Sequence, residues 1–168
     1  MQSVSTFEEL KRAVEIGGEI KLASDITMSE SITLSKDVTL DLAGKTLTTK
    51  DQIIVGDGVT FTLNDSTDGD KTGQIFNDIA ATLVDFGSKC KAAIQVGTTT
   101  GENANFIMNG GNIIAGDNGI NINGRGVAIV NDGRIEAYGN SCVFTSDCTG
   151  SDDHFNFEMN GGEVTQRE

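Results

Sequence analysis

The chain has 168 residues, with 12 basic against 25 acidic side chains and a net charge of −13. This length suits one domain with its own hydrophobic core. The few basic residues are scattered, so they offer no cationic surface for nucleic-acid phosphates or for an anionic membrane, and no apolar run is long enough to span a bilayer. We therefore expect neither a nucleic acid nor a membrane as partner.

The first predicted element is an amphipathic helix over residues 6–16. Two overlapping capping signals begin it, each a Ser or Thr three residues before a Glu. Leu10 and Val14 fall on one face of this helix, and a pair of glycines follows to end it. We expect residues 1–18 to form an N-terminal helical cap.

From residue 19 onward, short segments of alternating apolar and polar residues are separated by Gly, Asn and Asp, which is typical of strands joined by turns. Five segments repeat one form: a strand, a short polar turn and a second strand, with a third strand before each. The first strands of these segments end at Leu42, Leu63, Met108, Val130 and Met159. The unit is about 22 residues, and the double gap between Leu63 and Met108 allows either two units or one unit with an insertion.

Three strands and no helix in about 22 residues predict a parallel β-helix, a solenoid whose coils stack at the strand spacing of about 4.8 Å. We expect an all-β fold of about five or six coils over residues 19–168, which together with the cap forms a single domain over residues 1–168. Strand alternation points these side chains inward: Val38, Leu40, Leu42, Val59, Phe61, Leu63, Phe106, Met108, Phe155, Phe157 and Met159. In the fourth segment Val127 and Ile129 are apolar on the opposite phase, so the register there stays open.

Asn64, Asn109, Asn131 and Asn160 take the first turn position in four of the five segments, and Ala43 interrupts the series. Stacking of the coils would bring these side chains together as an asparagine ladder, with the amides hydrogen-bonded along the stack. The alternative is that asparagine stands there only because it tolerates a left-handed backbone. The sequence leaves both explanations open.

One stretch, near residues 76–93, does not fit the repeat. It is either a degenerate extra coil or an excursion that packs on the rod, and an excursion would be the more natural place for a partner contact. Cys90 lies in this stretch, and the other cysteines are Cys142 and Cys148. An odd count argues against a disulfide framework, so we expect small buried side chains, with a Cys142–Cys148 bridge as the alternative.

Two stretches carry a resemblance to a known family: LASDIT at 22–27 and TLDLAGKTL at 39–47. They are similar to the opening coils of right-handed parallel β-helix proteins of the pectate-lyase-like superfamily, in which a short helix often plugs the N-terminal end. The resemblance implies a right-handed coil. Members of the superfamily include polysaccharide lyases and hydrolases, phage tailspikes, virion fibre and decoration proteins and bacterial surface repeats, so the resemblance does not select a function.

Enzymes of this superfamily place carboxylates and a basic residue together on one outward strand face, and its hydrolytic members need a carboxylate pair. In this sequence the outward positions of the first strands carry Asp41, Thr62, Ile107, Ile129 and Glu158. The two acids stand at opposite ends of that row. We expect no catalytic residue, no cofactor and no enzyme activity.

Asp65, Asp68 and Asp70 are a loose candidate set for a cation such as Ca²⁺, although they miss the EF-hand spacing and lack its closing Glu. The only histidine lies in the run Asp152-Asp153-His154, where a metal-binding or acid–base role competes with a solvated loop. We expect no resident metal ion.

The sequence stops within the last strand of a coil, where core residues and strand edges would be exposed, so we expect another copy, a partner or missing sequence to cover them. Val164 and Gln166 stand on this partner-facing end, and the chain begins with Met and shows no secretion signal. We expect a non-catalytic structural protein, an accessory virion component of a bacteriophage of the capsid-decoration or head-fibre type. It would reside in the virion and bind other virion proteins or its own copies.

The alternative is a carbohydrate-binding or carbohydrate-cleaving β-helix module of a tailspike or a bacterial surface protein, extracellular or on the cell surface, with a glycan as ligand. Tyr138 is the only tyrosine and tryptophan is absent, so aromatic platforms for sugars are scarce. A fragment of a repetitive bacterial adhesin is a third hypothesis.

Overall fold

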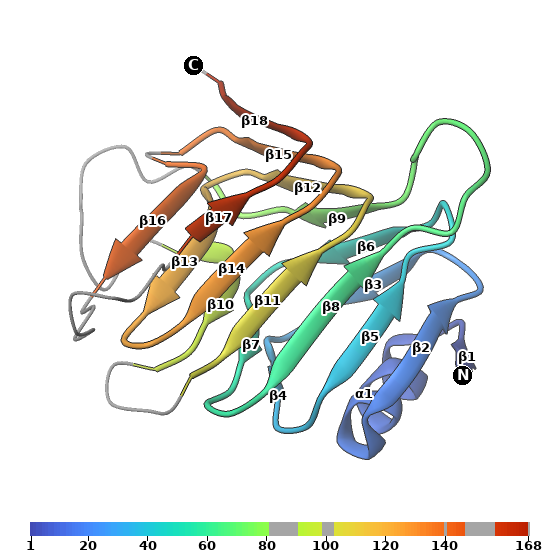
Figure 1. The fold of residues 1–168 in the computed structure, drawn as a ribbon. Helices are drawn as coiled ribbons and strands as arrows, with labels where there is room; N and C mark the ends of the chain where they lie inside the picture. Colours follow the sequence, from blue (N-terminus) through green and yellow to red (C-terminus); the bar gives the residue numbers. More distant parts are fainter. Residues whose placement is uncertain (81–90, 99–102, 140, 147–156, 168) are drawn as a thin grey trace.

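The computed structural model describes residues 1–80, 91–98, 103–139, 141–146 and 157–167. In this part of the chain the strands run parallel in three sheets, and successive strands enter the three sheets in rotation (Figure 1). The chain is therefore a parallel β-helix of about six coils, which confirms the predicted fold class.

The three sheets, named A, B and C, contain these strands. Sheet A consists of β1 (Gln2–Val4), β2 (Gly18–Leu22), β5 (Val38–Asp41), β8 (Thr60–Asn64), β11 (Asn105–Met108), β14 (Val127–Val130) and β17 (Phe157–Met159). Sheet B consists of β3 (Ile26–Met28), β6 (Thr46–Thr49), β9 (Gln74–Asn77), β12 (Asn112–Ala115), β15 (Arg134–Ala137) and β18 (Glu163–Gln166). Sheet C consists of β4 (Ile32–Leu34), β7 (Ile53–Val55), β10 (Ala92–Val96), β13 (Asn118–Asn123) and β16 (Val143–Ser146).

Strand register stacks equivalent side chains into continuous interior files, because each coil lies directly over the one before. In sheet A one file consists of Leu40, Leu63, Met108, Val130 and Met159. A second file consists of Val38, Phe61, Phe106, Ala128 and Phe157. The phenyl rings of Phe61 and Phe106 lie with their centroids 5.4 Å apart. A coil cannot bury its apolar side alone, so this stacking supplies the core.

The predicted alignment of the first coil was wrong by two residues. Leu40, and not Leu42, pairs with Leu63. Leu42 is nevertheless fully buried, in the turn that follows β5. Leu40 and Leu42 are two residues apart, so strand alternation points both inward. Alternation alone could not show which of them is equivalent to Leu63. Ala43 lies in the same turn, with a left-handed φ of 49°.

The register left open in the fourth segment is settled by strand pairing. Ala128 and Val130 are fully buried, whereas Val127 and Ile129 point outward and are half-buried. Ile129 pairs with Ile107 on the neighbouring strand. The outward apolar side chains of this segment thus shield one another on the face of sheet A.

The double gap between Leu63 and Met108 holds one coil with long connections at all three corners. These connections are residues 65–73 between β8 and β9, 78–91 between β9 and β10, and 97–104 between β10 and β11. Strand β10 pairs directly with β7, and β9 pairs directly with β6. The irregular stretch predicted near residues 76–93 therefore adds no coil to the sheets. Its residues 81–90 lie outside the described part of the chain.

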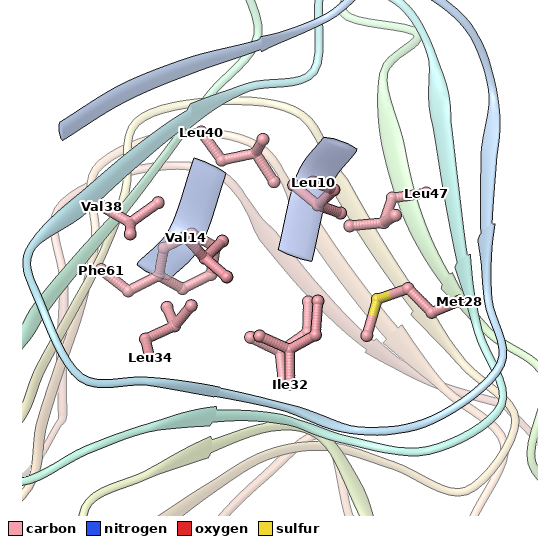
Figure 2. A pocket seen from close by; sticks show the side chains of 10 residues that line it. Leu10, Val14, Met28, Ile32, Leu34, Val38, Leu40, Leu47 and Phe61 are labelled. Atoms are coloured by element: carbon pink, nitrogen blue, oxygen red, sulfur yellow. The ribbon is translucent and has the colours of Figure 1, made fainter. Parts of the chain in front are cut away.

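Helix α1 (Phe7–Ile16) closes the N-terminal end of the coil. The hydroxyl of Thr6 accepts a hydrogen bond from the backbone N–H of Glu9, and Gly17 ends the helix with a left-handed φ of 82°. Leu10 and Val14 are buried and point into the ring of strands with side chains from all three sheets (Figure 2). Only about 20 Å³ of apolar cavity remains there, far below the volume of a ligand pocket, so the helix fills this end.

Candidate functional site

The interior files end in exposed side chains at the C-terminal end of the solenoid. Met108 and Val130 are 0% exposed, whereas Met159, the next residue in their file, is 42% exposed. In sheet B, Ile135 is fully buried and its neighbour Val164 is 38% exposed. The difference arises because no described coil covers β17 and β18. We call Phe157, Met159, Val164 and Gln166, with the strand edges around them, the C-terminal face.

Backbone groups are open at the same place. Strands β16, β17 and β18 are the last strands of sheets C, A and B, and none of the strands in the described ranges pairs with their outer edges (Figure 1). An unpaired parallel edge offers a row of N–H and C=O groups to an added strand. The C-terminal face thus combines apolar side chains with hydrogen-bonding groups at fixed spacing.

Val164 and Gln166, the two residues predicted to face a partner, make different contacts in the structure. The amide of Gln166 donates to the carbonyl of Gly139, and its Oε1 lies 3.5 Å from the sulfur of Cys142. Val164 packs over Ile135 and is otherwise exposed. The structure therefore brings both to the C-terminal face, with Val164 as the apolar contact and Gln166 as a tie to the coil beneath.

A buried carboxylate, which the sequence analysis missed, stabilises this end. Glu136 points outward from β15 but is only 3% exposed, because Arg134, Tyr138 and Arg167 surround it. The Nε of Arg167 lies 3.1 Å from its Oε1, the hydroxyl of Tyr138 donates to the same oxygen at 2.7 Å, and Arg134 pairs with Oε2. The hydrogen bond from Arg167, followed by that from Tyr138, lowers the pKa of Glu136.

The sequence does contain a signal for this cluster. Arg134 and Glu136 alternate along β15, and Tyr138 directly after the strand keeps the same spacing, so all three project on one face. Arg167 follows one coil later, directly after β18. A carboxylate pair is the pattern expected of a hydrolytic site, and Glu136 is instead a single carboxylate between two arginines, so that pattern did not predict it.

The asparagines predicted to form a ladder lie in register and are hydrogen-bonded to one another. The Nδ2 of Asn109 donates to the Oδ1 of Asn64 at 3.0 Å, that of Asn131 to Asn109 at 2.8 Å, and that of Asn160 to Asn131 at 3.0 Å. Among the described residues Ala43 alone combines a side chain with a positive φ. None of the four asparagines needs a left-handed backbone, so their hydrogen bonds explain their presence.

The polar column continues beyond the ladder. Asp41, and not Ala43, pairs with Asn64, and Lys21 pairs with Asp41. The Asp41 carboxylate accepts hydrogen bonds from the backbone and hydroxyl of Ser66 and from the backbone of Ala43. Burial would raise the pKa of Asp41, but these bonds from Ser66 and Ala43 outweigh it and lower that pKa.

Alongside this column runs a shallow groove on the outer face of sheet A, near the N-terminal end. Its volume is about 370 Å³, and Glu19, Thr39, Asp41, Asn64 and Asn109 line it together with Met1 and the 65–66 turn. The lining offers carboxylates, amides and hydroxyls beside the apolar side chains of Met1 and Ile20, and it contains no aromatic side chain. The groove can therefore hydrogen-bond a polar ligand and cannot stack against a sugar ring.

The outward row of sheet A also differs from the predicted one. Thr39, and not Asp41, pairs with Thr62, and the row continues through Ile107 and Ile129 to Glu158. At its N-terminal end the row begins with Glu19, which pairs with Thr39, so its two carboxylates, Glu19 and Glu158, lie at opposite ends. The described part of this row thus provides no carboxylate pair for acid–base chemistry.

The cation candidates Asp65, Asp68 and Asp70 do not come together as a site. Asp65 is buried, and its carboxylate accepts hydrogen bonds from the backbones of Gly44, Gly73 and Thr67 and from the Thr67 hydroxyl. Burial acts to raise the pKa of Asp65, yet these bonds lower it overall. Asp68 and Asp70 are exposed. Within the described ranges no group of three or more acidic, His or Cys side chains could hold a metal ion.

A positive charge already occupies this loop. The ammonium of Lys71 donates to the carbonyl oxygens of Asp65 at 2.9 Å and Thr67 at 2.8 Å. The Asp65 carboxylate and the Lys71 ammonium thus both bond to backbone groups of residues 65–73 and hold the conformation of this loop. Asp65 therefore has a structural role.

Several predicted residues lie outside the described part of the chain: Cys90, Cys148, Asp152, Asp153, His154 and Phe155. Cys142 is described and buried, with a free thiol. Burial raises the pKa of that thiol. A buried thiol with a raised pKa is a poor nucleophile.

A scan against protein-family models, a search of curated proteins and a search of solved structures each found no match. Of the helices described, none has the length and apolar character needed to cross a bilayer. What this chain does must therefore be argued from its own surfaces.

Proposed function

We propose that the protein is a non-catalytic structural module that joins a larger assembly through its C-terminal face. One observation carries the proposal: Met159 and Val164 are 42% and 38% exposed where the preceding members of their files are fully buried. Burial of apolar surface contributes about 25 cal/mol per Å². A partner that covers this face gains that free energy and also pairs the open edges of β16, β17 and β18.

The setting we propose is an accessory position on a bacteriophage particle, as a capsid-decoration or head-fibre protein. In keeping with the resemblance described above, we propose that the coil is right-handed and of the pectate-lyase-like type. The acidic surface, with a net charge of −13, would keep such a protein soluble and suppress non-specific contacts. The C-terminal face is where attachment would be specific.

The test is to purify virus particles from the source by density gradient and to quantify this protein in them by mass spectrometry. We expect a fixed copy number per particle. Particles stripped of the protein should take up added wild-type protein, but not the Met159→Glu/Val164→Glu variant. The matched control is Phe76→Glu, because Phe76 is 37% exposed on sheet B, away from the C-terminal face. Absence from the particles, or equal uptake of all three proteins, would overturn the proposal.

The groove on sheet A favours a second candidate, a module that binds or cleaves a carbohydrate. Its amides and hydroxyls match the donors and acceptors of a polyhydroxylated ligand. We would titrate acidic and neutral polysaccharides against wild-type protein and Asn64→Ala by calorimetry, and assay for reducing or unsaturated ends. Binding that Asn64→Ala weakens supports this candidate, whereas no heat and no new ends with any polysaccharide refute it.

A further inference from the structure

We propose that the solenoid binds one water molecule in its interior, where the water bridges the side-chain amides of Asn77 and Asn118. The site lies at the corner between sheets B and C, away from the C-terminal face, so it goes beyond the proposed function and does not depend on it. The water would tie the coil of β9 and β10 to the coil of β12 and β13. Three observations lead to this site.

The first observation is the arrangement of four buried side chains at this corner. Asn77 ends β9 in sheet B, and Ala92 begins β10 in sheet C. In the next coil, Ala115 ends β12 and Asn118 begins β13. Asn77 pairs with Ala115, and Ala92 pairs with Asn118. All four are at most 1% exposed. The asparagines therefore stand on one diagonal of the corner, and two small side chains stand on the other.

The second observation is that neither amide is fully hydrogen-bonded. The Nδ2 of Asn77 donates to the carbonyl oxygen of Asp51 at 3.0 Å, and the Oδ1 of Asn118 accepts from the backbone N–H of Ser141 at 2.9 Å. The Oδ1 of Asn77 and the Nδ2 of Asn118 are buried and have no hydrogen-bond partner among the described residues. Flipping either amide would set two acceptors or two donors against each other, so the existing bonds fix both orientations.

The third observation is the direction in which the unpaired atoms point. Asp51 lies between β6 and β7, in the coil before that of Asn77, and Ser141 lies between β15 and β16, in the coil after that of Asn118. The oxygen and nitrogen of a carboxamide lie on opposite sides of its carbon atom. The unpaired oxygen of Asn77 and the unpaired nitrogen of Asn118 therefore face each other across the boundary between their two coils.

Water is the ligand whose chemistry fits this pair of atoms. It donates to an acceptor and accepts from a donor at the same time, and two polar partners are enough to hold a buried water. A cation would be repelled by the amide hydrogens of Asn118. An anion would be repelled by the oxygen of Asn77 and by the fully buried Asp117, which precedes Asn118. Buried polar groups left without a partner destabilise a fold, so the bound water stabilises the corner.

The site also fits the unequal connections at this corner. Strands β9 and β10 are joined by residues 78–91, whereas β12 and β13 are joined by residues 116–117 alone. The two connections cannot match residue for residue as the turns of the asparagine ladder do. A bridging water would thus link the two coils at a corner where the chain provides no repeated side-chain contact between them.

The experiment is a high-resolution crystal structure of the full chain. We expect an ordered oxygen atom about 2.7–3.2 Å from both Oδ1 of Asn77 and Nδ2 of Asn118. A peak about 2.3–2.6 Å from Oδ1 of Asn77 would mark a cation instead and would overturn the proposal. The proposal is equally refuted if no ordered atom bridges the two amides, or if a protein atom occupies that place.

Serine substitutions supply an independent readout. Ala115→Ser adds a hydroxyl beside Asn77, where it can replace the water and bond to both amides. The matched control is Ala128→Ser, because Ala128 is fully buried in sheet A and pairs with Phe106 and Phe157, which offer a hydroxyl no polar side chain. We expect the urea midpoint to fall at least about twice as far in Ala128→Ser as in Ala115→Ser. Equal falls would contradict a polar site at this corner.

Discussion

In the asparagine ladder, one type of side chain links the stacked turns to one another by hydrogen bonds. Each described turn between sheets A and B in the later coils places an exposed amide over the one before, and a single amide both donates and accepts. The hydrogen bonds all run in one direction along the stack, from Asn160 towards Asn64. The ladder thereby fixes the register of neighbouring turns, which bury little apolar surface of their own.

Asn109→Ala should destabilise the fold more than Asn160→Ala. Asn109 makes two ladder hydrogen bonds and Asn160 makes one, and each is worth about 0.5–1.5 kcal/mol before its exposure is considered. We expect a loss of about 1–2 kcal/mol for Asn109→Ala and about half of that for Asn160→Ala. Urea unfolding followed by circular dichroism measures both.

The control is Asn105→Ala, at the start of β11, the strand that leads into Asn109. The side chain of Asn105 makes no hydrogen bond among the described residues, so its loss should cost little. Equal losses for Asn105→Ala and Asn109→Ala would show that the amide bonds do not stabilise the turns.

Asp65 should make the stability of the protein depend on acid pH. Its pKa is lowered in the folded state, so its contribution is fully present above the unfolded pKa of about 4 and is lost as the pH falls through the folded pKa. Asp41 acts in the same direction. We expect the free energy of unfolding, measured in urea, to fall as the pH is lowered below about 4.

Asp65→Asn should remove part of that dependence and cost about 2–3 kcal/mol at pH 7, since hydrogen bonds to a charged group are the stronger ones. The control is Asp68→Asn, on the same loop and exposed. An unchanged pH profile in Asp65→Asn would assign the acid sensitivity to other groups.

For single residues, the sequence predicts the contacts of side chains that recur in each coil and misses the contacts of those that occur once. The four ladder asparagines recur at equivalent places, so their spacing alone brought them together. Glu136 occurs once, and its burial depends on Arg167 from the next coil. The position of Asp41 was missed for another reason, because Leu40 and Leu42 are both buried and either could have ended the strand.

Helix α1 is the element that ends the solenoid at its N-terminus. Its residues and limits were predicted nearly correctly, because capping signals and a helical apolar face are local features. The long connections 65–73, 78–91 and 97–104 were not predicted to share one coil, since only strand pairing reveals where the chain rejoins each sheet. Local patterns thus define elements, while their place in the coil requires the partner strand.

Leu10→Ala should destabilise the protein by about 2–5 kcal/mol, the usual range for a buried leucine. Leu10 is 3% exposed and lies over the interior of the first coil. Chemical unfolding measures the loss. Arg12→Ala, on the exposed side of the same helix, should change stability by less than about 0.5 kcal/mol. Similar effects of both substitutions would mean that α1 does not seal the core.

The described part of the molecule is close to a one-dimensional stack, because its strands pair only with those of the neighbouring coils. The number of coils followed from the period of the sequence, since stacking converts a repeat in sequence into a repeat in space. The period could not predict whether the two ends of the solenoid are covered or exposed. One end is filled by α1, and the other exposes Met159 and Val164.

This difference between the ends predicts the direction in which the protein opens. Local unfolding in a stack starts where a coil has one neighbour and little cover. Backbone amides of β17 and β18 should therefore exchange with deuterium faster than those of β8 and β11, while β2, held beneath α1 and β1, should resemble the centre. Exchange measured by mass spectrometry on peptic fragments resolves these strands. Uniform protection along the stack would contradict the prediction.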